Sequence, residues 1–325
     1  AQNFFVLGGM GMFYVMANKP EASVTIFLVS SFLIGVGWAF VAPSRLAALG
    51  QYVTENKLAQ STIVFNLLVM VGFGLAPILL TQIQWAFEWK GVAITSITMF
   101  VISSLLLINA PNNHKRLSHE NLKQEWTECF SSLKDIAVIP QLLFAAIIGY
   151  LMMGPMQVIL PQVAEQQLGL STIEKGQYLG LMAFSLILGG IAAMKLKEHL
   201  PIGRSILVML FFCGACLGLI GMIKTVWLSC LVLVIGTTLA GTVVSFIVAG
   251  LQQFTPAAIR GRVMSIYTII SQVVSAMAGV LAGALAQGVN VPFSLYVISA
   301  LFIFLTLLLS IKGRILKQFY HFRSA

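Results

Sequence analysis

Long runs of apolar residues, separated by short polar segments, make up most of the chain. Charged residues and turn formers delimit ten of them. At about 20 residues each, the runs are long enough to cross the hydrocarbon core of a bilayer as helices. They lack the period-two alternation of a transmembrane barrel strand. The pattern predicts ten membrane-spanning helices, at residues 1–17, 22–46, 58–84, 91–109, 140–160, 175–196, 202–223, 226–252, 260–287 and 292–313.

One polar segment, residues 111–139, is longer than the others. It opens with Pro111-Asn112-Asn113, a helix-ending signal. Apolar residues within it recur at helical spacing, which predicts an amphipathic helix on the membrane surface. The segment divides the chain into a four-helix N-terminal half (1–110), the cytoplasmic linker (111–139), a six-helix C-terminal half (140–313) and a tail (314–325).

The composition agrees with this organisation. Hydrophobic residues make up 58% of the chain, charged residues only 9%, and the mean hydropathy is +0.94. A soluble domain has about a quarter of its residues charged. We therefore expect an all-α membrane protein that contacts the lipid bilayer. The net charge of +9 does not indicate nucleic-acid binding, because the basic residues lie in short loops between apolar runs.

The basic residues also predict a topology. If the ten runs cross the membrane in turn, 15 of the 19 Lys and Arg residues fall on one side. The remaining four, Lys19, Lys90, Lys175 and Lys224, fall on the other. Lys and Arg accumulate on the cytoplasmic side of membrane proteins. Both termini and the linker are therefore expected in the cytoplasm.

Two segments on that side carry related patterns, about 200 residues apart. The first begins at Pro43-Ser44-Arg45 and ends at Ser61, where a helix opens. The second begins at Phe254-Thr255-Pro256 and continues into Arg260-Gly261-Arg262-Val263-Met264-Ser265. An internal repeat of this length is typical of a transporter built from two halves.

On four features the chain resembles the major facilitator superfamily, and more narrowly its bacterial exporter branch, which includes the enterobactin exporter and drug-efflux carriers. The features are the Pro43 segment, Asn66 followed by Gly72-x-Gly74-x-Ala76-Pro77, Leu160-Pro161, and Arg260–Ser265. The resemblance implies a secondary transporter of the bacterial inner membrane. The chain departs from the family's antiporter motif at Ala76, where the family usually has Gly, and at Leu80-Thr81, where the family often has a Gly pair.

The family has twelve helices, in two halves of six. Aligning the long linker leaves this chain the last four helices of the first half and all six of the second. We therefore expect the first two helices, with the Gly-Asp-Arg signature that follows them, to be missing. A chain lacking them is expected not to carry out gradient-coupled transport.

Polar stripes on apolar helices are the candidate substrate-binding residues. They are Asn66, Tyr150 and Gln157 (separated by Gly154-Pro155), Thr238 and Thr242, and Gln272. Hydroxyl and amide groups also join membrane helices to one another. We favour packing for the Ser and Thr residues, while both interpretations stay open for Gln157, Gln272 and Asn66.

Arg45, Arg260, Gly261 and Arg262 are candidate gating residues. An Arg side chain can bind carbonyl groups at helix ends, and Gly permits a tight turn. Anchoring by positive charge on the cytoplasmic side is the equal alternative. Gly279-x-x-x-Gly283 is expected to mark a close helix contact.

All ten acidic residues fall in loops or at helix ends, so no carboxylate is expected at mid-membrane depth. Protons as a coupling ion would then depend on Glu165 at a mouth or on the missing helices. The C-x-x-C formed by Cys213 and Cys216 lies inside an apolar run and is expected to serve packing. No cofactor or metal site is expected, nor clustered His, Asp or Glu as in a membrane-embedded enzyme.

The sequence therefore predicts a carrier, not an enzyme, that exports an amphipathic small molecule such as a siderophore or drug by alternating access. Met152, Met153, Met156 and Phe184 fit an adaptable apolar cavity. The alternatives are a lipid or nutrient carrier of the same fold and a truncated remnant that does not transport.

Overall fold

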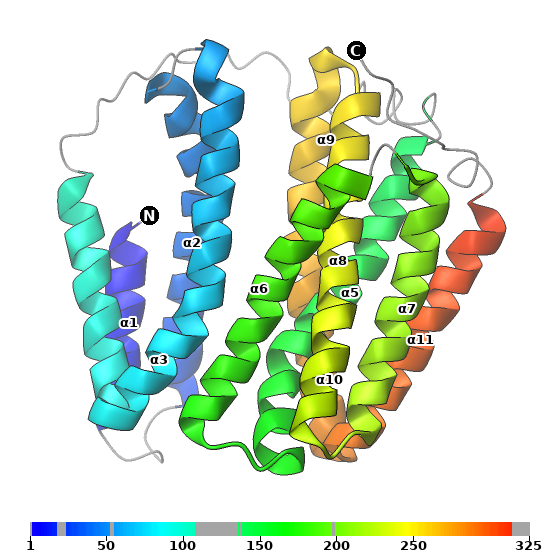
Figure 1. The fold of residues 1–325 in the computed structure, drawn as a ribbon. Coiled ribbons are helices and arrows are strands. Elements are labelled where there is room, and N and C mark those ends of the chain that lie inside the picture. Colours follow the sequence, from blue (N-terminus) through cyan, green and yellow to red (C-terminus); the bar gives the residue numbers. More distant parts are fainter. Residues whose placement is uncertain are drawn as a thin grey trace. The chain divides into compact units, whose positions relative to one another are not determined.

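The computed structural model describes residues 2–17, 24–52, 55–107, 136, 138–196 and 199–313, and their ordered elements are all helical (Figure 1). The predicted amphipathic helix of the linker and the tail at 314–325 lie outside the described residues. The elements are α1 (Gln2–Ala17), α2 (Val24–Tyr52), α3 (Glu55–Leu106), α5 (Val138–Gln162), the π-helix η2 (Val163–Gln167), α6 (Thr172–Leu196), α7 (Ile202–Met222), α8 (Val226–Phe254), α9 (Ala257–Ile269), the π-helix η3 (Ile270–Val274), α10 (Ser275–Gly288) and α11 (Val291–Lys312).

The prediction of an all-α membrane protein is confirmed. Within the described residues, eight segments are long and apolar enough to cross a bilayer, and α1 contains a shorter apolar helix. The predicted span 58–84 and most of the span 91–109 fall in α3, which breaks at Glu88 (φ 56°, ψ −169°). The predicted span 260–287 is one continuous rod, α9–η3–α10, with a π-turn in its middle.

The connection predicted between the spans 22–46 and 58–84 is too long. Helix α2 continues to Tyr52 and α3 begins at Glu55, so most of this segment is helical. The apolar run ends where the bilayer is expected to end, but the backbone has no reason to stop there. Residues such as Leu46, Ala47 and Ala48 are strong helix formers in water as well.

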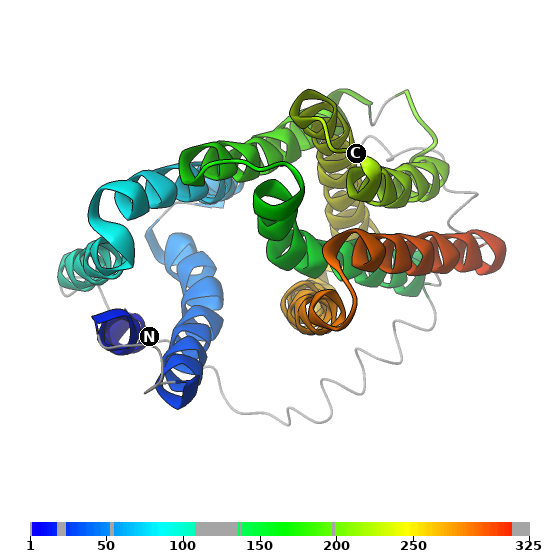
Figure 2. The same ribbon diagram turned by 90° about the horizontal axis from the view of Figure 1, so that it is seen from below.

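The chain forms two compact units, residues 1–118 and 119–325, and their boundary falls in the predicted linker. In unit 1, α1 packs against α2 and α3. In unit 2, the most extensive pairings are α6 with α8, α7 with α11, and α5 with α10. Helix α5 contacts α6, α7, α8, η3, α10 and α11, and it is the central helix of this unit (Figure 2).

The helices of unit 2 alternate in direction (Figure 1). The α6–α7 and α8–α9 connections and the end of α11 therefore lie at one end. The α5–α6, α7–α8 and α10–α11 connections lie at the other. Lys195, Arg204, Arg262 and Lys312 are all near the first end, whereas Lys175 and Lys224 are at the second. This agrees with the charge asymmetry; which end faces the cytoplasm stays a prediction.

Candidate functional site

The contact between α5 and the α9–η3–α10 rod brings together most of the polar residues singled out in unit 2. The two elements run in the same direction, because Tyr150 pairs with Tyr267 and, further along, Val158 lies against Gly279 and Gly283. The predicted close contact at Gly279-x-x-x-Gly283 is confirmed.

Gly154 sets the distance between the two helices. A Cβ atom there would collide with the carbonyl oxygen of Ser275 and lie 2.5 Å from the backbone nitrogen of Gly279. Only a residue without a side chain allows the backbones of α5 and α10 to touch in this way. Gly154 thereby fixes the position of the two polar residues on the same face of α5, Tyr150 and Gln157.

Tyr150 is hydrogen-bonded to a partner that the polar stripes did not include. The Tyr150 and Tyr267 hydroxyl oxygens are 2.7 Å apart, and the rings meet edge to face with centroids 5.8 Å apart. Tyr267 is only 8% exposed. A tyrosine inside an apolar helix is itself a signal, because its buried hydroxyl needs a partner. This signal identifies Tyr267 from the sequence.

Gln272 lies in the middle of η3 and is exposed. A π-turn inserts one extra residue into a helix and is frequent at functional sites. It also changes the helical spacing between Gln272 and the nearest polar residues one turn away, Thr268 and Ser275. Thr268 is exposed and its hydroxyl donates to the carbonyl oxygen of Met264 (2.9 Å), whereas Ser275 is half-buried against α5.

Beyond η3, the two helices border a pocket that we call the α5–α10 groove. Its volume is about 410 Å³. Small residues make up most of its lining, and its polar groups are the amides of Gln157 and Gln287 and the hydroxyl of Ser275. The lining residues are Gly154, Gln157, Val158, Ser275, Ala276, Gly279, Val280, Gly283, Ala284 and Gln287. The described lining carries no charge, so the groove can hydrogen-bond a ligand without pairing with an ion.

The structure does not bring Thr238 and Thr242 to this groove. Thr242 is 2% exposed, and its hydroxyl is 3.0 Å from the carbonyl oxygen of Gly189 on α6 and 3.0 Å from that of Thr238. It therefore joins α8 to α6, the packing role that we favoured for the Ser and Thr stripes. Thr238 is half-buried one turn earlier.

The remaining predicted residues are placed by their backbones. Asn66 lies in α3, Arg45 in α2 and Arg260 in α9, but their side chains are outside the described part of the structure. Gly261 is exposed within α9 and has open space around it, so the tight turn expected there is wrong. Residues 257–269 form a helix, in which Arg262 is half-buried.

The α5–α6 connection lies at the other end of unit 2 from Arg262. The Glu165 carboxylate pairs with the Lys175 ammonium at 2.7 Å, and the Glu165 side chain is 64% exposed. The Gln167 side-chain amide donates to the carbonyl oxygens of Ile220 (2.9 Å) and Ile223 (2.7 Å), which end α7. Glu165 therefore sits at the end of a helix, as the sequence predicted.

A sequence model of the family described as Major Facilitator Superfamily matches residues 4–279. No curated protein matches the chain. Its fold is similar to a POT family transporter solved with 5-aminolevulinic acid (14% identity, TM-score 0.71, 97% of this chain and 82% of that chain). It is also similar to a bacterial homologue of the human lysosomal transporter Spinster (14%, 0.67, 98% and 82%). A third similar structure is a bacterial homologue of the iron transporter ferroportin (16% identity, TM-score 0.65, 95% of this chain and 80% of that chain). At these identities the likeness shows the fold alone.

Proposed function

The chain belongs to the major facilitator superfamily of secondary transporters, and we propose that it exports an amphipathic small molecule across the bacterial inner membrane. The cargo class, a siderophore or drug, comes from the resemblance to the exporter branch. The mode of action is alternating access, in which one binding site opens first to one side of the membrane and then to the other.

The observation that carries this proposal is the exposure of Gln157 and Gln272 on helices that are otherwise apolar. An amide facing hydrocarbon without a partner is costly, so polar residues inside a membrane protein mark helix contacts or substrate paths. Within the described residues, neither amide makes a hydrogen bond to another helix as the Thr242 hydroxyl does. A bound molecule with hydrogen-bonding groups would satisfy both.

The α5–α10 groove supports an amphipathic cargo. Its volume of about 410 Å³ lies in the range of small-molecule sites, about 300–1,000 Å³. The Gly, Ala and Val residues of its lining would contact a hydrophobic part of the cargo, and Gln157, Ser275 and Gln287 would hydrogen-bond its polar groups. We propose Tyr150 and Gln272 as contacts on the same face. Asn66 and Thr238 stay further proposals for substrate contact, whereas Thr242 is assigned to helix packing.

Gating and coupling are proposals of the same kind. We assign Arg45, Arg260 and Arg262 to the gate at the cytoplasmic end, and Gly261, which lies within helix α9, is no longer assigned a turn there. A proton-coupled step would use Glu165, whose exposed position beside Lys175 supports a role at a mouth rather than in the membrane interior.

The test is binding by the purified chain in lipid nanodiscs, since binding requires the groove but not a complete transport cycle. A panel contains amphipathic dyes, a catecholate siderophore, sugars, amino acids and phospholipids. Amphipathic compounds are expected to bind and to compete with one another. Selective binding of a sugar or amino acid would establish a nutrient carrier instead, and selective phospholipid binding a lipid carrier. If no member binds, the proposal is rejected.

A further inference from the structure

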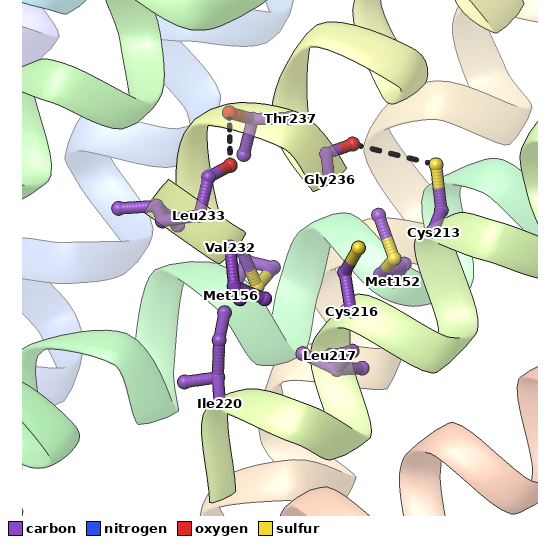
Figure 3. A pocket seen from close by; sticks show the side chains of 10 residues that line it. All are labelled: Met152, Met156, Cys213, Cys216, Leu217, Ile220, Val232, Leu233, Gly236 and Thr237. Carbon is purple, nitrogen blue, oxygen red and sulfur yellow. Dashed lines mark hydrogen bonds between the residues drawn. The ribbon is translucent and has the colours of Figure 1, made fainter. Parts of the chain in front are cut away.

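Four sulfur-containing side chains border a small cavity between α5, α7 and α8 (Figure 3). Met152 and Met156 are one turn apart on α5, and Cys213 and Cys216 lie three residues apart on α7. Met152, Met156 and Cys213 are 7%, 5% and 1% exposed, and Cys216 is half-buried. This cavity is distinct from the α5–α10 groove, because at 100° per residue the two Met side chains lie on nearly the opposite face of α5 from Gly154 and Gln157.

The oxygen atoms that line the cavity already have partners. The Thr237 hydroxyl donates to the carbonyl oxygen of Leu233 at 2.6 Å, and the Cys213 thiol donates to that of Gly236 at 3.4 Å. The rest of the described lining is aliphatic: Leu217, Ile220, Val232 and Leu233. The polarisable atoms left facing this space are the sulfurs of Met152, Met156 and Cys216.

The size of the cavity selects among possible occupants. Its volume, measured as the space that the centre of a water molecule can occupy, is about 10 Å³. This is enough for one water molecule. A buried water needs two to four polar partners, whereas thioether and thiol sulfurs are weak hydrogen-bonding groups. A bare cation that prefers sulfur fits both the volume and the chemistry.

We propose that this cavity binds one soft monovalent cation, Cu(I) or Ag(I), through the sulfurs of Cys216, Met152 and Met156. Soft thiolate and thioether ligands select Cu(I) over the hard cations Mg²⁺ and Ca²⁺. On binding, the S–H bond of Cys216 breaks, a metal–sulfur bond forms and one proton leaves. The oxidation state of the metal does not change.

Charge balance makes such a site compatible with the interior of a helix bundle. One thiolate neutralises one monovalent cation, so the site buries no net charge. Burying an uncompensated charge would cost much free energy. A divalent cation would leave an uncompensated charge unless Cys213 also lost its proton and its hydrogen bond to Gly236. The site goes beyond the proposed export function, and neither depends on the other.

The competing interpretation is that the four residues only fill space, as Met and Cys commonly do. Cu(I) titration separates the two. The full chain, with Cys129 and Cys230 replaced by serine, is titrated anaerobically in detergent against a chromophoric Cu(I) chelator. The parent is expected to bind one Cu(I) per chain, with a sulfur-only coordination sphere in X-ray absorption spectra.

The double variant Met152→Leu/Met156→Leu keeps the volume of both side chains, and it should weaken Cu(I) binding at least about tenfold, since even indirect partners of a metal are worth that much. Cys216→Ala should abolish it. Met153→Leu, one residue from the site but outside the lining, is the matched control and should bind as the parent does. Thermal unfolding without metal identifies any variant that fails to fold, and Cu(I) should raise the midpoint only where it binds.

Three results would overturn the proposal. They are no Cu(I) binding by the parent, nitrogen or oxygen ligands in the spectrum, and unchanged affinity in the folded Met152→Leu/Met156→Leu variant. The dye-binding experiment on the α5–α10 groove is unaffected by any of them, so the two proposals fail separately.

Discussion

The hydroxyl oxygens of Tyr150 and Tyr267 lie 2.7 Å apart and join α5 to α9 by a side-chain hydrogen bond. On the other side of η3, α10 is held to α5 by backbone contact at Gly154. The rod α9–η3–α10 is thus attached to the central helix on both sides of its π-turn.

Replacing either tyrosine with phenylalanine removes this bond and leaves one hydroxyl without its partner. Tyr150→Phe and Tyr267→Phe should each lower the free energy of unfolding by about 1 kcal/mol. The double variant should cost little more than one single change, because no orphan hydroxyl remains. Reversible unfolding in mixed micelles measures this cycle, with exposed Tyr296→Phe as control. Additive single effects would show that the two hydroxyls do not interact.

Gln157→Ala and Gln272→Ala test the substrate site. Made in a full-length parent, each should weaken binding of an amphipathic dye and reduce cellular efflux, because the amide loses its bonds to the cargo, while abundance in the membrane stays unchanged. Gln177→Ala, an exposed glutamine on α6, is the control. If the amides serve helix contacts instead, thermal stability and abundance will fall together with binding.

Gly154→Ala should destabilise unit 2. The added methyl group collides with the α10 backbone, and overpacking of this kind costs about 1–3 kcal/mol. Gly149→Ala on the same helix has no atom within 4 Å of the new Cβ and should be neutral or stabilising by up to about 1 kcal/mol. The unfolding midpoints of the two variants are compared directly. Equal midpoints would contradict the close contact between α5 and α10.

Cysteine labelling tests the topology. In a background without native cysteines, a membrane-impermeant reagent applied from outside should reach thiols at Asn18 and Thr225. It should not reach thiols at Asn113 and His199, because the side rich in Lys and Arg faces the cytoplasm. Labelling after permeabilisation confirms that all four thiols are reactive. The reverse pattern would place the C-terminus outside the cell.

The sequence by itself determined the helical fold. In a bilayer, the backbone N–H and C=O groups of an apolar run can be hydrogen-bonded only in a helix or a closed barrel. The runs lack the alternation of barrel strands, so they must be helices. It also placed the charged residues at helix ends, since burying an ion in hydrocarbon is costly. Glu165 and Lys175 are two such residues.

Only the tertiary structure decided which polar residues meet. Thr242 and Gln157 look alike in the sequence, each a polar residue in an apolar helix. In the fold, the Thr242 hydroxyl bonds Gly189 on a neighbouring helix, whereas the Gln157 side chain borders the α5–α10 groove. Likewise the π-turn at Ile270–Val274 and the meeting of Met152 and Met156 with Cys216 depend on how helices pack. Periodicity gives the face of a helix, but the partner of that face is set by contacts between segments far apart in the chain.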